Sequence, residues 1–140
     1  MNANTMNTAA ANAATRFLPF AGRLLIGGIF LMSGLSKIPA YTDIAAAISG
    51  AGLPFAPLGF AVAVSVEVGL GLLLLIGYRV RPVALGLAIW CLVTALFFHR
   101  NFADQNTMIH FLKNLLIAGG LLQIVHFGAG PISLDARSGR

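Results

Sequence analysis

The stretch that most constrains this chain is LGFAVAVSVEVGLGLLLLIGY, residues 58–78. It is about as long as a helix needs to cross the hydrocarbon core of a bilayer, roughly 20 residues. Its one charged residue, Glu67, lies near the middle, where a charged side chain costs roughly 2.5–3.5 kcal/mol on insertion scales. We therefore expect other helices of the chain to shelter Glu67 from lipid.

The composition indicates an integral membrane protein whose first partner is the lipid bilayer. Only 9% of its 140 residues are charged and 58% are hydrophobic, whereas soluble domains carry about 25% charged residues. The net charge of +5 does not indicate a nucleic-acid partner, because no basic stripe alternates with aromatic residues. The single cysteine, Cys91, excludes a CxxC redox pair or a zinc site made of cysteines.

The pattern predicts an all-α transmembrane four-helix bundle with spans at about residues 17–36, 58–78, 82–99 and 109–127. The first loop, residues 38–57, is interrupted by Pro and Gly, but its segment YTDIAAAISGAG predicts a short interfacial helix. We therefore divide the chain into a disordered tail at 1–15, a membrane domain at 16–127 and a polar tail at 128–140.

Two of the spans carry small residues on one face, together with a charge. Residues three and four apart share a face of a helix, and small residues there let a neighbouring helix approach closely. The face in the first span comprises Arg23, Gly27, Phe30, Gly34 and Lys37; that in the second comprises Phe60, Ala63, Glu67, Gly71, Leu74 and Tyr78. Both faces should turn into the bundle.

The basic residues predict the topology, since cytoplasmic loops carry an excess of Lys and Arg. With four spans, both termini and the 79–81 turn share one side, which carries Arg16, Arg79, Arg81, Arg137 and Arg140. The other side has Lys37, Arg100 and, just inside the span, Lys113. We therefore predict that both termini are cytoplasmic.

We predict an intramembrane polar cluster of Arg23, Glu67, Lys113 and Asn114, in which Arg23 and Lys113 approach the carboxylate from opposite sides. Intramembrane ionisable groups usually pair and face the interior. Three interpretations stay open: an ion pair that only fixes packing, a pocket in which Glu67 accepts a proton or anchors a ligand, and a protonated, hydrogen-bonded Glu67.

Three further residues, Lys37, His99 and His110, are predicted at the membrane interface. A metal site would need a third ligand besides the two histidines, and Asp104 is the only carboxylate in the loop between them. Hydrogen bonding at the interface is therefore the favoured role of this histidine pair, and we predict no metal site.

The order of several motifs resembles the DoxX family of small four-span bacterial inner-membrane proteins. The resemblance covers about residues 16–137 and rests on Arg23 with SGLSK at 33–37, GLP at 52–54, Glu67, GYRVRP at 77–82, HFLKN at 110–114, AGG at 118–120 and ISLD at 132–135. The positions that match the family pattern are Arg23, Lys37, Glu67, Arg81, Lys113 and Asn114.

This resemblance implies a four-helix bundle in a bacterial inner membrane and little chemistry, because most members have no established activity. The family takes its name from a subunit of a thiosulfate:quinone oxidoreductase, so we expect an accessory subunit of a quinone-linked redox system, with partner proteins or a homo-oligomer. The alternatives are a small transporter or channel that uses the Glu67 cluster, and a quinone-dependent enzyme. We assign no catalytic residue, and a quinone is the one cofactor that the sequence would accommodate.

Overall fold

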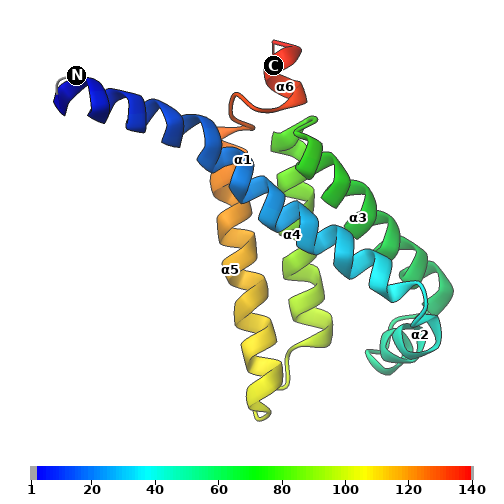
Figure 1. The fold of residues 1–140 in the computed structure, drawn as a ribbon. Coiled ribbons are helices and arrows are strands. Elements are labelled where there is room, and N and C mark those ends of the chain that lie inside the picture. Colours follow the sequence, from blue (N-terminus) through cyan, green and yellow to red (C-terminus); the bar gives the residue numbers. More distant parts are fainter. Residues whose placement is uncertain (1–2, 140) are drawn as a thin grey trace.

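The structure, a computed structural model, describes residues 3–139 (Figure 1). These residues form helices and no strand. The helices are α1 (Ala3–Lys37), α2 (Tyr41–Gly50), α3 (Ala56–Ile76), α4 (Val80–Phe98), α5 (Gln105–Phe127) and α6 (Leu134–Arg137).

Four of the described helices are long and apolar enough to cross a membrane: Thr15–Lys37 within α1, and the whole of α3, α4 and α5. This confirms the predicted all-α fold with four spans. The helices form two pairs, in which α1 packs along α3 and α4 along α5, while contacts between α3 and α4 join the pairs. The pairs diverge toward the end of the molecule that carries α2 (Figure 1).

The α1–α3 contact depends on the glycines that the sequence placed on the two inner faces. A Cβ atom added to Gly27 would lie 2.8 Å from the Gly71 carbonyl oxygen, and one added to Gly34 would lie 2.7 Å from Cγ2 of Val68. These distances are too short for any side chain, so the two backbones touch. Ala63, Glu67, Gly71 and Leu74 are the buried residues of α3, which confirms its predicted inner face.

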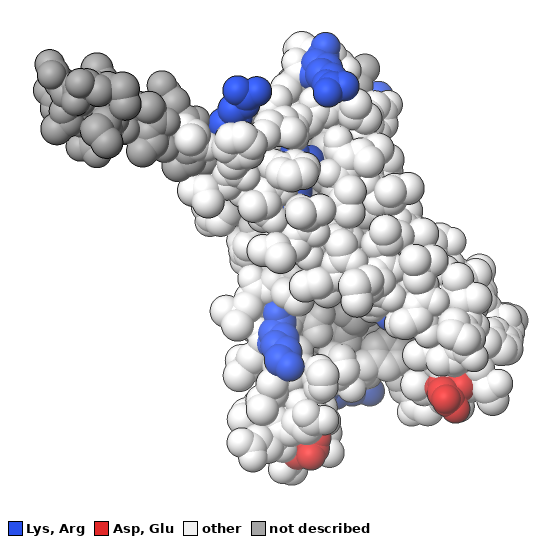
Figure 2. Space-filling view, in the orientation of Figure 1, with Lys and Arg blue, Asp and Glu red and all other residues white. Residues whose placement is uncertain are grey.

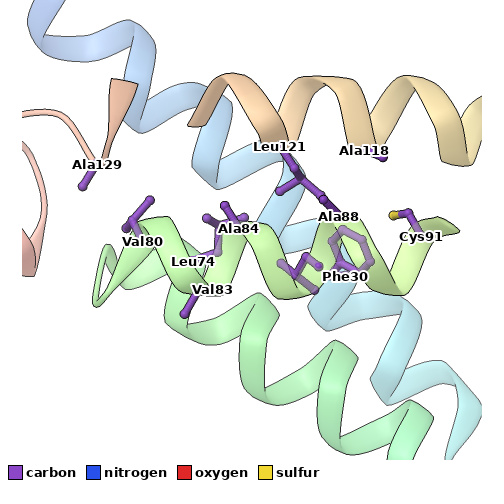
Figure 3. Close-up of a cluster of buried hydrophobic side chains, with 11 residues drawn as sticks. Phe30, Leu74, Val80, Val83, Ala84, Ala88, Cys91, Ala118, Leu121 and Ala129 are labelled. Atoms are coloured by element: carbon purple, nitrogen blue, oxygen red, sulfur yellow. The ribbon is translucent and has the colours of Figure 1, made fainter. Parts of the chain in front are cut away.

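The apolar core lies around α4 and joins both pairs (Figure 3). Leu74 from α3, Leu87 from α4 and Leu121 from α5 are completely buried. Small residues of α4, such as Ala84 and Ala88, face Leu121 and let α5 approach (Figure 3). Cys91 is part of this core, as expected for a small apolar side chain.

The interfacial helix α2 packs on the part of α3 that extends beyond the end of α1. Gly34 lies level with Glu67 and Val68, so α1 ends one turn later at Lys37 while α3 extends back to Ala56. At 1.5 Å per residue, α1 therefore stops about 12 Å short of the start of α3. There α2 packs on α3, with the buried Ile48 against Gly59.

Both terminal segments contain helical residues. Helix α1 begins at Ala3, so Pro19 lies in its interior. The residues before the span are rich in Ala, which has the highest helix propensity, and contain no Gly or Pro; residues 1–2 lie outside the described part. The C-terminal segment folds back onto the bundle, where Ser133 and Asp135 are buried.

Candidate functional site

Glu67 is the acceptor in a buried network that joins three helices. Its Oε2 atom lies 2.6 Å from Lys37 Nζ of α1, and its Oε1 atom accepts a hydrogen bond of 3.1 Å from Trp90 Nε1 of α4. Lys37 also donates to Ser33 Oγ at 2.9 Å. The cost of placing a carboxylate inside the membrane is thus offset by one cation and one neutral donor.

Lys37 reaches Glu67 because of the direction in which helical side chains point. Each Cα–Cβ bond tilts toward the helix N-terminus, so the Lys37 side chain runs back along α1 toward the level of Gly34. Gly34 is the residue that touches Glu67 and Val68. The side chain of Lys37 is 21% exposed and that of Glu67 is 8% exposed, so of this pair Lys37 is the more accessible from outside the bundle.

Contrary to our prediction, Arg23 does not approach Glu67. It donates through Nη1 to the carbonyl oxygens of Leu74 at 3.1 Å and Leu75 at 3.3 Å, and through Nη2 to that of Ile132. Along α1, Arg23 lies about 16 Å from the level of Gly34, beyond the reach of its side chain. It instead satisfies carbonyl groups in the last turn of α3, where a cation is favoured.

Within residues 3–139, no hydrogen bond or ion pair joins Lys113 or Asn114 to Glu67. No ion pair joins Lys113 to a carboxylate within residues 3–139, and its side chain is exposed. Asn114 links α5 to α4, since Thr94 Oγ1 donates to Asn114 Oδ1 at 3.4 Å, while Asn114 Nδ2 donates to the His110 carbonyl oxygen at 3.0 Å. The predicted cluster of four residues is therefore divided among three places.

The two interfacial histidines come together where α4 ends and α5 begins. The rings of His99 and His110 stack with centroids 5.3 Å apart. Burial, and then the nearby His110, lower the pKa of His99 below its ordinary value of 6.5. Across the described residues, no group of three His, Cys, Asp or Glu side chains is arranged to hold a metal.

A second polar network, which the sequence reasoning missed, closes the opposite end of the bundle. Asp135 accepts hydrogen bonds of 2.8 Å from the backbone N–H groups of Arg79 and Val80, and its own N–H donates to the Gly77 carbonyl oxygen at 2.9 Å. Asp135 thus caps the start of α4. The only sequence signal was the ISLD segment, which does not reveal its distant partner.

The fold and these networks define a small integral membrane protein with four spanning helices and a buried ion pair between the first two. The sequence model of the DoxX family matches residues 18–100, and the chain therefore belongs to the DoxX family. It is a multi-pass protein of the bacterial inner membrane.

Two relatives from Escherichia coli K12 are similar along most of their length. Inner membrane protein YqjF is 36% identical over 115 residues, which cover 81% of this chain and 85% of the relative. Inner membrane protein YphA is 31% identical over 139 residues, which cover 96% of this chain and 99% of the relative. No solved structure matches significantly.

Proposed function

We propose that this protein is an accessory subunit of a quinone-linked redox system and that the network around Glu67 receives the polar head of a quinone. One observation carries the proposal: Lys37, Glu67 and Trp90 bring an ammonium, a carboxylate and an indole N–H together inside the membrane from three helices. A few convergent polar groups within apolar surroundings are typical of a small-molecule site.

The donors in this network match the chemistry of a quinone, whose carbonyl oxygens accept hydrogen bonds. Lys37 Nζ makes its longest contact, 3.5 Å, with the Ser33 carbonyl oxygen, and the side chain is partly exposed. Lys37 would hold a quinone oxygen in place of this weak contact while it keeps its bond to Glu67. Bound quinone would supply two-electron chemistry, with the electrons drawn from a redox-active partner subunit. Of the two protons that accompany this reduction, Glu67 would hold one, and the second would come from water.

The accessory role is supported by how much of each span the chain leaves uncovered. In the apolar 18-residue stretch of α5 only 11% of the residues are buried, and in the corresponding stretch of α1 only 17%. Surfaces of this extent are available to lipid, to the helices of a partner protein or to a second copy of the chain. We therefore propose membrane partners or a homo-oligomer.

Transport is the second candidate, and the divergence of the two helix pairs favours it. The space-filling view shows a hollow in the lower half of the molecule, toward the end that carries α2 (Figure 2). In transporters and pumps, intramembrane charges face the interior of the bundle or a water-filled cavity. Proton flux driven by substrate in proteoliposomes would favour transport over the accessory role.

We further propose that both termini face the cytoplasm. The supporting observation is the distribution of charge over the surface. On the face shown in Figure 2, Lys and Arg side chains are visible toward both ends, and Asp and Glu only toward the end opposite α6. Among residues 3–139, the end that carries α6 has four basic residues, Arg16, Arg79, Arg81 and Arg137, and the other end has three, Lys37, Arg100 and Lys113. This is the asymmetry that the positive-inside rule associates with a cytoplasmic α6 end.

Photo-crosslinking of a quinone analogue to the purified protein tests the ligand site, with Lys37→Met and Glu67→Gln as variants and Lys113→Met as the matched control. We expect labelling of the parent and of Lys113→Met, and its loss in the other two. Equal labelling of all four proteins would contradict the site. A gentle detergent pull-down analysed by mass spectrometry tests the accessory role, which predicts a redox-active partner protein.

A further inference from the structure

A groove at the α6 end combines arginines with an apolar wall. Its volume is about 610 Å³, and it lies between the start of the spanning part of α1, the end of α3 and the C-terminal segment. Arg16 and Arg137 provide the charge, and the apolar side chains that line the groove include Phe20, Ile76, Ile132 and Leu134. The groove therefore lies at the level where the hydrocarbon core meets the headgroups.

Within residues 3–139, neither Arg16 nor Arg137 forms an ion pair. The one ion pair within residues 3–139 joins Lys37 to Glu67, and no described residue accepts a hydrogen bond from the guanidinium of Arg16 or Arg137. Arg16 lies over the ring of Phe17, with 5.9 Å from Cζ to the ring centroid. These two guanidinium groups are therefore free to bind an anion.

A third arginine lies behind the wall. Arg23 is buried and donates to the carbonyl oxygens of Leu75 and Ile132, both of which line the groove, while its Nε atom has no hydrogen-bond partner. The carboxylate of Asp135, at the same end of the bundle, is already engaged by the backbone N–H groups of Arg79 and Val80. The local charge is thus positive, with three guanidinium groups against one carboxylate.

From these observations we propose that the groove binds the headgroup of an anionic phospholipid, with its acyl chains along Phe20 and Ile76. Arg16 and Arg137 bind the phosphate oxygens, since guanidinium groups match phosphate geometry. Basic pockets between spans on the cytoplasmic side commonly bind anionic headgroups. The apolar wall favours a lipid over free phosphate, which would leave that wall exposed to water. This inference does not depend on the quinone site.

Native mass spectrometry of the purified full chain tests the proposal, with dioleoylphosphatidylglycerol and dioleoylphosphatidylcholine as probes. We expect the parent to prefer phosphatidylglycerol. The double variant Arg16→Gln/Arg137→Gln should bind it roughly tenfold more weakly or worse, as expected for two basic side chains near an anionic headgroup. The double variant Arg16→Lys/Arg137→Lys should keep most of the preference, which separates loss of charge from loss of fold.

The matched control is Arg79→Gln/Arg81→Gln, which removes the same charge from the same end but outside this groove. We expect it to keep the preference for phosphatidylglycerol. Equal losses in the two glutamine variants would mean diffuse attraction and would overturn the site. Equal binding of the two lipids by the parent, or displacement of phosphatidylglycerol by inorganic phosphate, would overturn it as well.

Discussion

A Cβ atom placed on Gly34 would lie 3.0 Å from the Cβ atom of Glu67, so the first two spans touch almost backbone to backbone at the level of the carboxylate. This contact sets the height at which Lys37 meets Glu67, because Lys37 is one turn beyond Gly34 on the same face. The ion pair and the glycine contact are therefore parts of one interface, and each can be tested separately.

The glycine contact predicts opposite effects at two glycines of α1. Gly34→Ala should destabilise the fold by roughly 1–3 kcal/mol, because the added methyl group overpacks the interface. Gly28→Ala meets no atom within 4 Å and should be neutral or slightly stabilising, since Ala has the higher helix propensity. Thermal melts in detergent compare the two variants, and a loss of the same size in both would contradict the close approach.

The ion pair predicts that Glu67→Ala costs roughly 3–5 kcal/mol, because it leaves Lys37 without its counter-charge inside the bundle. Glu67→Gln should be milder. The double variant Lys37→Met/Glu67→Leu should recover most of the loss, since replacing both partners by apolar groups is often neutral. Lys113→Met, the control, should melt like the parent. A melt of Glu67→Ala that matches the parent would show that the pair does not contribute.

The cap on α4 predicts that the C-terminal segment stabilises the bundle. Asp135→Ala strands the N–H groups of Arg79 and Val80 and should cost roughly 1–3 kcal/mol. Asp43→Ala removes a carboxylate from the exposed start of α2, where it makes no capping bond, and serves as the control. Limited proteolysis of residues 128–139 should be faster in Asp135→Ala alone.

The histidine pair predicts a loss of stability in acid. The pKa of His99 is lowered in the folded protein by burial and by His110, so the unfolded state binds the proton more readily. The contribution of His99 to stability is therefore fully present above about pH 6.5, the ordinary pKa of histidine. It is lost as the pH falls toward the lower pKa that His99 has in the folded protein. The melting temperature followed from neutral to acidic pH should fall less in His99→Gln, and identical profiles would contradict this contribution.

The charge distribution predicts the orientation of the protein. A fluorescent protein fused to the C-terminus should be bright, and alkaline phosphatase fused there should be inactive, because the Arg-rich end stays in the cytoplasm. The same reporters inserted in the loop at 100–104, between α4 and α5, should give the reverse pattern. An active C-terminal phosphatase would mean that the positive-inside rule misleads for this chain.

The sequence by itself determined the four spans and the inner faces of the first two. Both follow from local properties: the length of an apolar run fixes a span, and a period of three to four residues fixes a face. For the same reason Gly27, Gly34 and Gly71 could be placed on faces that turn into the bundle, whereas their meeting at the α1–α3 contact came from the tertiary structure. The depth of Glu67 within its span was also a matter of counting residues.

Only the tertiary structure decided which cation meets Glu67 and what the C-terminal segment does. The partner is Lys37 and not Arg23, because α1 lies against α3 in an axial position that ends it about 12 Å short of the start of α3. That position depends on contacts between residues far apart in the chain. Asp135 likewise caps a helix more than fifty residues away, and no local pattern predicts a partner at that distance.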